Sequence, residues 1–323
     1  MIAFVLSGEC SALAEGEIDA LYASIGKCPK KIAKNDNLLL IENNVPKETV
    51  SQISFSHEAF LDCKLASPNT ISEVLLDIGI KKSDTFCVRT KGFPNNSKKE
   101  RELGEIIYES VHAGVSLNDP KIPVYCISFG DTIVVSTNRI GSSDFSSRDP
   151  NARPFFHPLS LSPKLARLFL NLAAIPKGGC VLDPFCGSGS ILIEAKEIGF
   201  KAIGRDLDKK MLYGSNKNLS YYGLSAKLEE GDATEIPDRE LDAIVSDPPY
   251  ARASKMFNRE LLDLYSKFIA SAYNALKSGG RLVMALPHDA RIAYASVGFK
   301  AIGEYDIYVH KSLTRRVYVL EKP

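Results

Sequence analysis

Four acidic residues in the second half of the sequence each follow a predicted strand. Asp183 stands before a glycine-rich turn, and Asp206 lies about 20 residues beyond that turn. Asp232 follows the next predicted strand, and Asp247 comes directly after another. Because the carboxyl ends of parallel strands meet at one edge of a sheet, we expect the four side chains to border one cleft.

The segment CVLDPFCGSGS at 180–190 predicts a strand, a tight turn and the start of a helix. Gly187 and Gly189 would let a ligand approach the backbone closely, and Asp183 can accept hydrogen bonds from it. The segment lacks the third glycine of a pyrophosphate fingerprint and the Gly-Lys-Ser/Thr of a phosphate loop. An acid at the strand end also suits a cationic ligand group better than a phosphate. A plain strand-to-helix turn is the alternative for this motif alone.

The next two acids fit a nucleoside. Asp206 stands where an acid meets a ribose diol in nucleoside-binding α/β folds. The side chain of Asp232 and the backbone amide of Ala233 can contact an adenine edge. Either acid alone could be an ordinary surface residue. Together with the glycine turn, they predict a pocket for an adenosine that carries a charged tail without phosphates.

The sequence Asp247-Pro248-Pro249-Tyr250 indicates the reaction. The prolines restrict the backbone, so the Asp247 carboxylate and a neighbouring carbonyl can face the pocket. An exocyclic amine on an aromatic ring is a poor nucleophile, and two acceptors that hold its hydrogens can direct its lone pair at an electrophile. Tyr250 offers a stacking face worth about 1–3 kcal/mol per base. The motif predicts methyl transfer from a sulfonium to a planar amine, achieved mainly by positioning; a bare turn is the alternative.

A regular α/β half is needed to position these motifs. From Leu159 onward, helices and strands alternate, and the predicted strands are 180–183, 202–206, 226–230, 243–247, 281–287, 299–310 and 315–322. Five strand–helix units followed by a hairpin predict an α/β, Rossmann-like, doubly wound sheet with a terminal antiparallel hairpin.

The first half predicts shorter and more mixed elements. Helices are expected at 12–25, at 70–78, where Thr70 and Glu73 would form a capping box, and at 98–111. Gly130–Asp131 predicts a hairpin between two strands. This mixture predicts α+β modules of the ferredoxin-like kind. Residues 140–158 are rich in Ser, Asp, Arg and Pro without periodicity, which predicts a linker.

The composition is that of an ordinary globular protein. The 323 residues are 45% apolar with a net charge of +1, and no stretch resembles a membrane span or a signal peptide. The seven cysteines show neither CxxC pairs nor zinc-site spacing, so we expect no metal, a reducing cytoplasm and mostly buried thiols, with a single disulfide left open.

The motifs at 183–189, 206, 232 and 247–250 resemble those of class I S-adenosyl-L-methionine-dependent methyltransferases that modify planar nitrogens. RPFFHPLSLSPKLARLFLNLA at 153–173 resembles the segment before the first motif in RNA guanine-N2 methyltransferases, and HKSLTRR at 310–316 is similar to their C-terminal signature. The first half resembles a THUMP RNA-binding module with its ferredoxin-like partner. Over nearly the whole chain, the sequence resembles the archaeal tRNA (guanosine-10, N2) methyltransferases, which make monomethyl- and dimethylguanosine.

The resemblance implies a cofactor, a partner and a domain plan. It implies S-adenosyl-L-methionine as methyl donor and tRNA as substrate; we expect a monomer that does not bind membranes, with an accessory subunit left open. The expected domains are 1–64 (ferredoxin-like), 65–139 (THUMP), 140–158 (linker) and 159–323 (methyltransferase). The implied cofactor-binding residues are Asp183, Phe185, Gly187, Gly189, Asp206, Asp232, Ala233, His157 and Ser160, and the implied catalytic residues are Asp247, Pro248, Pro249 and Tyr250.

Contacts with RNA are predicted from local basic groups. A Gly/Pro loop with basic flanks precedes the helix at 98–111, which suits phosphates, although a solvated charged turn is the alternative. Ala251 replaces a glycine that relatives often have after the Asp-Pro-Pro-Tyr motif. Arg315 and Arg316 are neighbours on a strand and face opposite sides, so at most one meets the substrate. The predicted RNA-binding residues are Lys91, Lys98, Lys99, Arg101, Arg252 and Arg315.

Three alternatives accompany this interpretation. The enzyme could methylate another RNA site, such as tRNA guanosine 6 or ribosomal RNA. It could be a DNA adenine-N6 methyltransferase, which shares Asp-Pro-Pro-Tyr, although no DNA-reading motif is present. It could also be an inactive RNA-binding protein, which the intact acids disfavour. Residues 1–157 carry 17 basic and 20 acidic side chains, so RNA binding would depend on local patches and shape.

Overall fold

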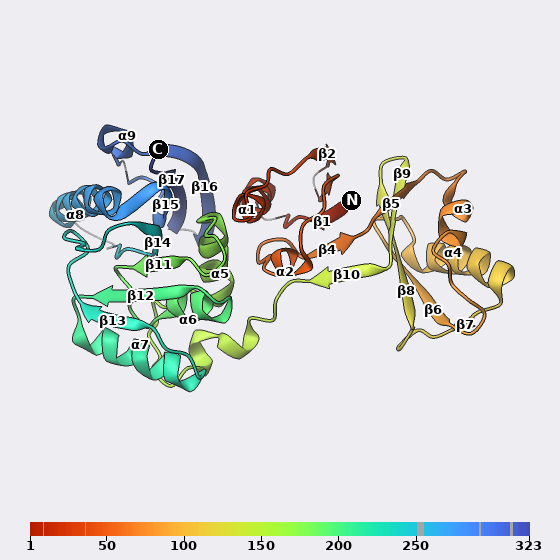
Figure 1. Cartoon of the computed structure of the whole chain (residues 1–323), viewed down its shortest axis with the longest axis horizontal. Helices are drawn as coiled ribbons and strands as arrows, with labels where there is room; N and C mark the ends of the chain where they lie inside the picture. Colours follow the sequence, from red (N-terminus) through yellow and green to blue (C-terminus); the bar gives the residue numbers. More distant parts are fainter. Residues whose placement is uncertain (9, 36, 251–254, 291, 311–312) are drawn as a thin grey trace. The chain divides into compact units, whose positions relative to one another are not determined.

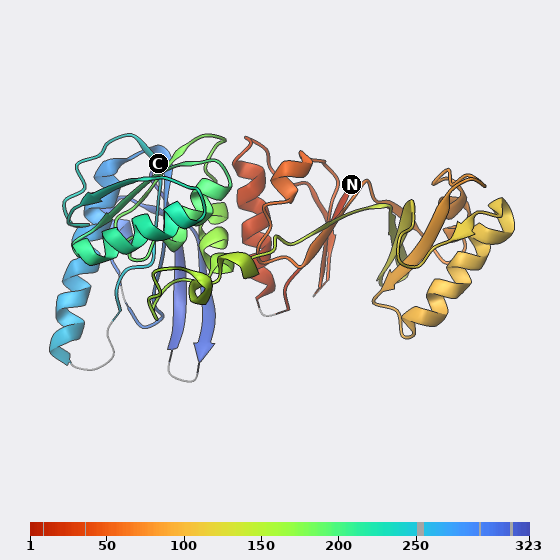
Figure 2. The ribbon, with the colours of Figure 1, turned by 90° about the horizontal axis from the view of Figure 1, so that it is seen from below.

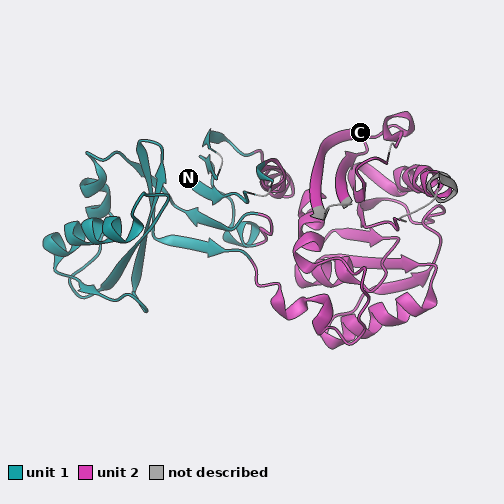
Figure 3. Ribbon diagram, turned by 180° about the vertical axis from the view of Figure 1, so that it is seen from behind, with its two compact units in different colours: residues 1–11, 29–51, 56–142 teal, residues 12–28, 52–55, 143–323 magenta. Residues whose placement is uncertain are grey.

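The computed structural model describes the chain except for residues 9, 36, 251–254, 291 and 311–312 (Figure 1). It forms two compact units, coloured separately in Figure 3. Unit 1 comprises residues 1–11, 29–51 and 56–142, and unit 2 comprises residues 12–28, 52–55 and 143–323. None of the described helices is both long enough and apolar enough to span a membrane.

Unit 2 is built on a seven-stranded mixed sheet. In spatial order its strands are β13 (Lys227–Glu230), β12 (Lys201–Asp206), β11 (Cys180–Asp183), β14 (Leu241–Ser246), β15 (Leu276–Pro287), β17 (Leu313–Glu321) and β16 (Lys300–His310). The first five are parallel, and β17 runs antiparallel to both of its neighbours, as Figure 2 shows for β16 and β17. The predicted doubly wound sheet with an antiparallel addition is confirmed.

The strands of this sheet are apolar because both faces are covered. Leu182, Ile244, Leu282 and Leu320 are register neighbours, and they belong to a core cluster completed by helix α8 (Lys255–Ala275). Strand residues of the other parity, such as Val283, are also buried, because helices pack against that face too. The remaining helices of this α/β half are α5 (Pro163–Leu172), α6 (Ser190–Glu197), α7 (Lys209–Tyr221) and α9 (Tyr294–Val297).

Two helices of unit 2, α5 and α7, begin at a residue whose side chain caps the helix N-terminus. Ser162 accepts a hydrogen bond from the Leu165 amide at 3.4 Å, and Pro163 occupies the first helical turn of α5. Asp208 caps α7 in the same way, through the Lys210 amide at 2.8 Å. These caps set the helix ends that border the carboxyl edge of the sheet.

A buried set of ion pairs anchors the segment before α5. The carboxylate of Glu194 on α6 is fully buried and binds Arg148 at 2.6 Å and Arg167 at 2.7 Å. Arg153 donates to the Ser190 hydroxyl at 2.6 Å. Two 3-10 turns, at Ser146–Arg148 and Pro150–Ala152, form here. Much of the aperiodic stretch at 140–158 is therefore fixed to unit 2 by charge and hydrogen bonds.

Helix α1 (Ser11–Ala23) is also attached to unit 2 through a buried carboxylate. Glu17 accepts from the Ser54 and Phe55 amides, both at 2.9 Å, and from the Ser54 hydroxyl at 2.5 Å. The Asn171 side chain on α5 donates to the same group at 2.8 Å. Because an unpaired buried carboxylate is costly, these four donors make Glu17 a specific docking point.

Unit 1 contains two five-stranded sheets. One holds, in spatial order, β10 (Asn138–Gly141), β4 (Glu58–Leu61), β1 (Ile2–Val5), β3 (Leu38–Ile41) and β2 (Lys31–Lys34). The other holds β5 (Lys64–Ala66), β9 (Thr132–Ser136), β8 (Ile122–Phe129), β6 (Thr85–Lys91) and β7 (Gly114–Val115). Its helices are α2 (Lys47–Val50), α3 (Ile71–Leu76) and α4 (Asn96–Val111).

Local predictions in unit 1 had mixed outcomes. The Gly130–Asp131 hairpin is confirmed, since Phe129 pairs with Thr132. The capping box at Thr70 is wrong: the Thr70 hydroxyl accepts from the Ser67 amide at 2.9 Å, and no side chain caps α3. Thr70 is committed to the preceding turn, so it is not available to the helix.

Candidate active site

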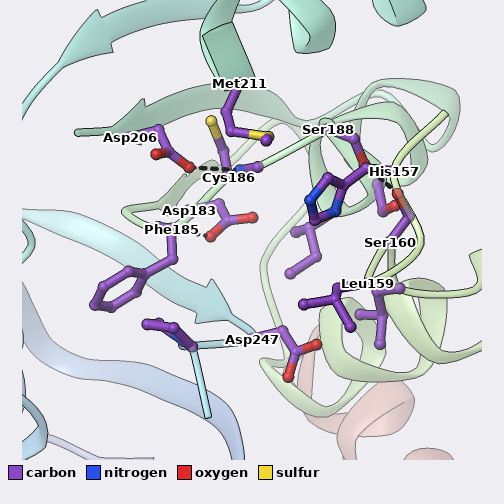
Figure 4. Close-up of a pocket in the computed structure, with 15 residues that line it drawn as sticks. His157, Leu159, Ser160, Asp183, Phe185, Cys186, Ser188, Asp206, Met211 and Asp247 are labelled. Carbon is purple, nitrogen blue, oxygen red and sulfur yellow. Dashed lines mark hydrogen bonds between the residues drawn. The ribbon is translucent and has the colours of Figure 1, made fainter. Parts of the chain in front are cut away.

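A cavity of about 250 Å³ opens at the carboxyl edge of β11, β12 and β14 (Figure 4). The predicted residues that line it are His157, Ser160, Asp183, Phe185, Gly187, Asp206, Asp247 and Pro249. Figure 4 shows three carboxyl groups, those of Asp183, Asp206 and Asp247, around the same hollow. The structure thus brings together residues that lie up to 92 positions apart, from 157 to 249.

The glycine turn has the backbone geometry that its sequence predicted. Gly187 and Gly189 have φ values of +50° and +87°, which side chains disfavour. A Cβ on Gly189 would stand 2.5 Å from the Ser215 hydroxyl oxygen of α7. The amide of Gly187 donates to the Asp206 carboxylate at 2.9 Å, so the turn and the second acid hold each other in place.

Asp183 is a buried carboxyl that is only 2% exposed. It accepts hydrogen bonds from the Ser246 hydroxyl at 2.6 Å and the Phe185 amide at 3.2 Å. Its pKa is raised to about 7, mainly by burial and to a smaller extent by the charges of Asp206 and Asp247, while the two hydrogen bonds act in the opposite direction. A cationic ligand group would stabilise the ionised form of this carboxyl.

Asp247 is paired with Arg315 on β17. The guanidinium Nη1 lies 3.2 Å and 3.0 Å from the two carboxylate oxygens of Asp247. Burial raises the pKa of Asp247 to about 6, although the positive charge of Arg315 acts in the opposite direction. Asp247 is therefore mostly ionised at neutral pH and can act as a hydrogen-bond acceptor.

The rest of the Asp-Pro-Pro-Tyr loop is held from two elements. Tyr265 on α8 donates to the Pro249 carbonyl at 2.8 Å. Arg315 donates to the Tyr250 hydroxyl through Nη2, and its guanidinium carbon lies 4.4 Å from the centre of that ring. Pro248 is buried and Tyr250 is half-buried.

The two neighbouring arginines of β17 do face opposite sides. Arg315 reaches Asp247, while Arg316 binds Asp306 at 2.8 Å and 3.0 Å on the other face. The alternation of side chains along a strand predicted this separation. The sequence analysis also predicted that Arg315 contacts RNA. In the structure, its Nη1 and Nη2 groups contact Asp247 and Tyr250.

Other predicted residues lie away from the cavity lining. Asp232 is exposed and binds the amide and hydroxyl of Thr234, both at 2.8 Å, and Ala233 is buried in the core. Arg252 lies outside the described residues. The cavity lining also includes residues that sequence reasoning missed, among them Leu159, Cys186, Ser188 and Met211.

The predicted basic residues of unit 1 surround the start of α4. Lys91 pairs with Glu58, and Lys98 and Lys99 lie 3.9 Å and 3.2 Å from Glu102. Arg101 donates to the Ser97 carbonyl at 3.3 Å. Within the part of the chain that the structure describes, no group of three His, Cys, Asp or Glu side chains could hold a metal ion.

Comparison with known proteins gives two matching family models. A model described as an RMKL-like methyltransferase domain matches residues 150–314. A model described as a DNA methylase matches residues 51–217, a stretch that ends before Asp247. The solved structure of TrmN from Thermus thermophilus aligns over 100% of this chain and 99% of that one, with a TM-score of 0.53 and 24% identity.

Curated relatives identify the family more closely. The tRNA (guanine(10)-N2)-dimethyltransferase of Pyrococcus abyssi is 32% identical over 327 residues, covering 96% of both chains. The enzyme of the same name from Methanothermobacter thermautotrophicus is 32% identical over 281 residues and 84% of both chains. The tRNA (guanine(6)-N2)-methyltransferase of Thermus thermophilus is 30% identical over 69% of this chain and 67% of its own length. The chain belongs to the tRNA (guanine(10)-N2)-dimethyltransferase family.

Proposed function

We propose that this protein transfers methyl groups from S-adenosyl-L-methionine to the exocyclic N2 of guanosine 10 in tRNA. One transfer gives N2-methylguanosine, and a second gives N2,N2-dimethylguanosine. The observation that carries this proposal is that Asp247, the acid of Asp-Pro-Pro-Tyr, lines the same cavity as Asp183 and Asp206. The chain that forms this cavity matches relatives with that activity in their names over most of its length.

The cavity residues fit S-adenosyl-L-methionine. Three carboxyl groups suit its positive charge, and Gly187 of the glycine turn lines the cavity with bare backbone. Asp183 and the turn would hold the methionine end, and Asp206 the ribose hydroxyls. Asp232 and Ala233 would contact the adenine, while Phe185, His157 and Ser160 would border the pocket. When bound, the cofactor supplies an electrophilic methyl group.

The Asp-Pro-Pro-Tyr loop would hold the target base. The Asp247 carboxylate and the Pro248 carbonyl accept hydrogen bonds from the guanine amine, which favours a nucleophilic nitrogen. Tyr250 stacks on the base. Asp247, ionised above a pKa of about 6, can accept the proton that the nitrogen loses after methylation. Catalysis then depends mainly on position, for which orientation can supply several kcal/mol.

Unit 1 would supply the main contacts with tRNA. We assign a ferredoxin-like module to 1–64, a THUMP module to 65–139, a linker to 140–158 and the methyltransferase domain to 159–323. The basic side chains near the start of α4 are partly exposed and can contact phosphates, as can Arg252. We expect a monomer that acts in the cytoplasm.

A second candidate is methylation of guanosine 6 in tRNA, because a relative with that name matches 69% of this chain. A DNA adenine methyltransferase is a weaker candidate, since the DNA methylase match excludes the loop at 247–250.

Product mapping tests the proposal. The protein is incubated with labelled S-adenosyl-L-methionine and unmodified tRNA, and the modified nucleosides are located by nuclease digestion and mass spectrometry. We expect N2-methylated guanosine at position 10. Methylation at position 6 supports the second candidate, and N6-methyladenine in duplex DNA without tRNA modification overturns the proposal.

A further inference from the structure

The contacts of Arg315 connect the C-terminal hairpin to the Asp-Pro-Pro-Tyr loop. One nitrogen of its guanidinium binds both Asp247 oxygens, at 3.2 Å and 3.0 Å, and another donates to the Tyr250 hydroxyl. The same planar group lies 4.4 Å from the centre of the Tyr250 ring. A single side chain therefore contacts both functional groups of the loop.

The surroundings of Arg315 restrict its side chain, so it can hold the groups that it contacts in fixed positions. It is only 8% exposed, and it belongs to β17, which has a paired strand on either side. Its register neighbours are Pro287 on β15 and Ile307 on β16. The fork of an arginine can bind a carboxylate and a second acceptor with fixed geometry, which a lysine cannot do.

We propose that Arg315 is a positioning residue that fixes the Asp247 carboxylate and the Tyr250 ring for the target base. It covers one face of the Tyr250 ring, so the base stacks on the opposite face. This inference rests on the proposed function. It differs from an RNA-phosphate role for Arg315, because the guanidinium faces the loop from inside unit 2.

The proposal has a distinct electrostatic consequence. The titratable groups around Asp247 are Arg315 from β17, Asp183 from β11, Tyr265 from α8 and Tyr250 from the loop itself. Arg315 is the cation of this set and lowers the pKa of Asp247, while burial raises it. Removing Arg315 therefore raises the pKa of Asp247, and the acid limb of the rate profile moves to higher pH.

The test compares Arg315→Ala and Arg315→Lys with Arg316→Ala, the neighbour on the opposite face. For each full-length protein, kcat and the KM values for tRNA and S-adenosyl-L-methionine are measured between pH 5 and 9. The wild-type protein must first form N2-methylguanosine in tRNA. If it does not, that result refutes the proposed function, and it is distinct from a result that refutes the role of Arg315.

We expect Arg315→Ala to lower kcat by about 100-fold, as a misplacement of roughly 1 Å can do, with little change in the KM of the cofactor. Its acid limb should move up by at least about one pH unit. Arg315→Lys should keep the acid limb near that of the wild type, because the charge remains, yet lose at least about tenfold in kcat, because the fork is lost. Arg316→Ala should stay within about threefold of the wild type.

The opposite results are equally clear. If Arg315→Ala keeps the wild-type kcat and acid limb, Arg315 does not position the loop. If its kcat/KM rises, the guanidinium occupies the place of the base and is displaced by it, which also overturns the proposal. Should the alanine variant fail to fold, the lysine variant decides: wild-type kcat in Arg315→Lys contradicts the proposal.

Discussion

Single residues of the cavity show how strongly the site favours positive charge. Asp183, Asp206 and Asp247 line one small space, and burial raises the pKa of Asp183 to about 7. Asp183 and Asp247, whose pKa values are raised, therefore ionise less readily than free carboxyl groups, and a bound cation would favour their ionised forms. Ligand binding and stability should be coupled through these groups.

Replacing Asp247 tests catalysis. We expect Asp247→Ala to reduce methyl transfer by roughly 10²–10⁴-fold, because the amine loses its acceptor, while calorimetry shows nearly unchanged binding of S-adenosyl-L-methionine. Asp263→Ala is the control, since Asp263 is 61% exposed on α8 and pairs only with Lys267 among the ion pairs of the described residues. Turnover of Asp247→Ala within about tenfold of the wild type would refute the catalytic assignment.

Replacing Asp183 tests the effect of burial on stability. The pKa of Asp183 is about 7 in the folded protein and roughly 3.9 in an unfolded chain. Its contribution to folding is thus greatest below pH 4 or so and is lost as the pH rises through about 7. Without ligand, Asp183→Asn should melt at a higher temperature than the wild type at pH 8, and this advantage should shrink at pH 5. Thermal unfolding at both pH values measures it; an advantage that grows toward pH 5 would contradict the shifted pKa.

At the scale of secondary structure, the turn before α6 restricts which residues the chain can accept, because its backbone is left-handed at Gly189 and lies close to Ser215. Gly189→Ala would force a side chain into a left-handed backbone and against Ser215. We expect a loss of about 1–3 kcal/mol in the free energy of unfolding and weaker cofactor binding. Chemical denaturation and calorimetry measure the two effects.

The control for that change is Gly104→Ala, inside α4. Its new Cβ would meet Val88 at 3.9 Å, an ordinary contact, in a normal helical conformation. It should stabilise the protein slightly, by about 0.4–1 kcal/mol. In Gly189→Ala, the added change Ser215→Ala should recover only part of the loss, because the backbone strain stays. Full recovery would show that the clash alone matters.

The elements of the α/β half could be predicted because helices and strands alternate regularly there and the strands β11, β12, β13 and β14 each end at, or directly before, an acid. The short strands β5 and β7 could not be predicted, because they have only three and two residues and their pairing partners, β9 and β6, are distant in sequence. Three of the four acids expected at one cleft, Asp183, Asp206 and Asp247, line the cavity, whereas Asp232 does not. The contact between Asp247 and Arg315 could not be predicted, because the two residues are 68 positions apart and no local pattern connects them.

For the whole molecule, the division into units does not follow the chain simply. Residues 12–28 and 52–55 belong to the unit that holds the catalytic sheet, and Glu17 binds Asn171 there. A cut at residue 143 therefore removes more than a separate RNA-binding half. It also leaves the Asn171 side chain without that partner.

A fragment of residues 143–323 tests this organisation. It should lose tRNA binding, keep cofactor binding and unfold at a lower temperature than the full chain, because the Glu17 contacts are gone. Filter binding, calorimetry and thermal unfolding measure the three properties. Glu17→Ala in the full chain is the matched variant and should lower the melting temperature without abolishing tRNA binding. Retained tRNA binding by the fragment would refute the assignment of RNA contacts to unit 1.

The position of β17 has a consequence for how the enzyme is made. The ribosome synthesises β17 after every other strand of its sheet, yet β17 inserts between β15 and β16. In the native sheet β15 and β16 each pair with β17 and not with each other, so during translation both lack this partner until β17 has been made. Arg315 also arrives with this last strand, so a nascent chain that stalls before it lacks both a closed sheet and the partner of Asp247. Formation of the full sheet and of the Asp247–Arg315 pair is thereby tied to the synthesis of β17.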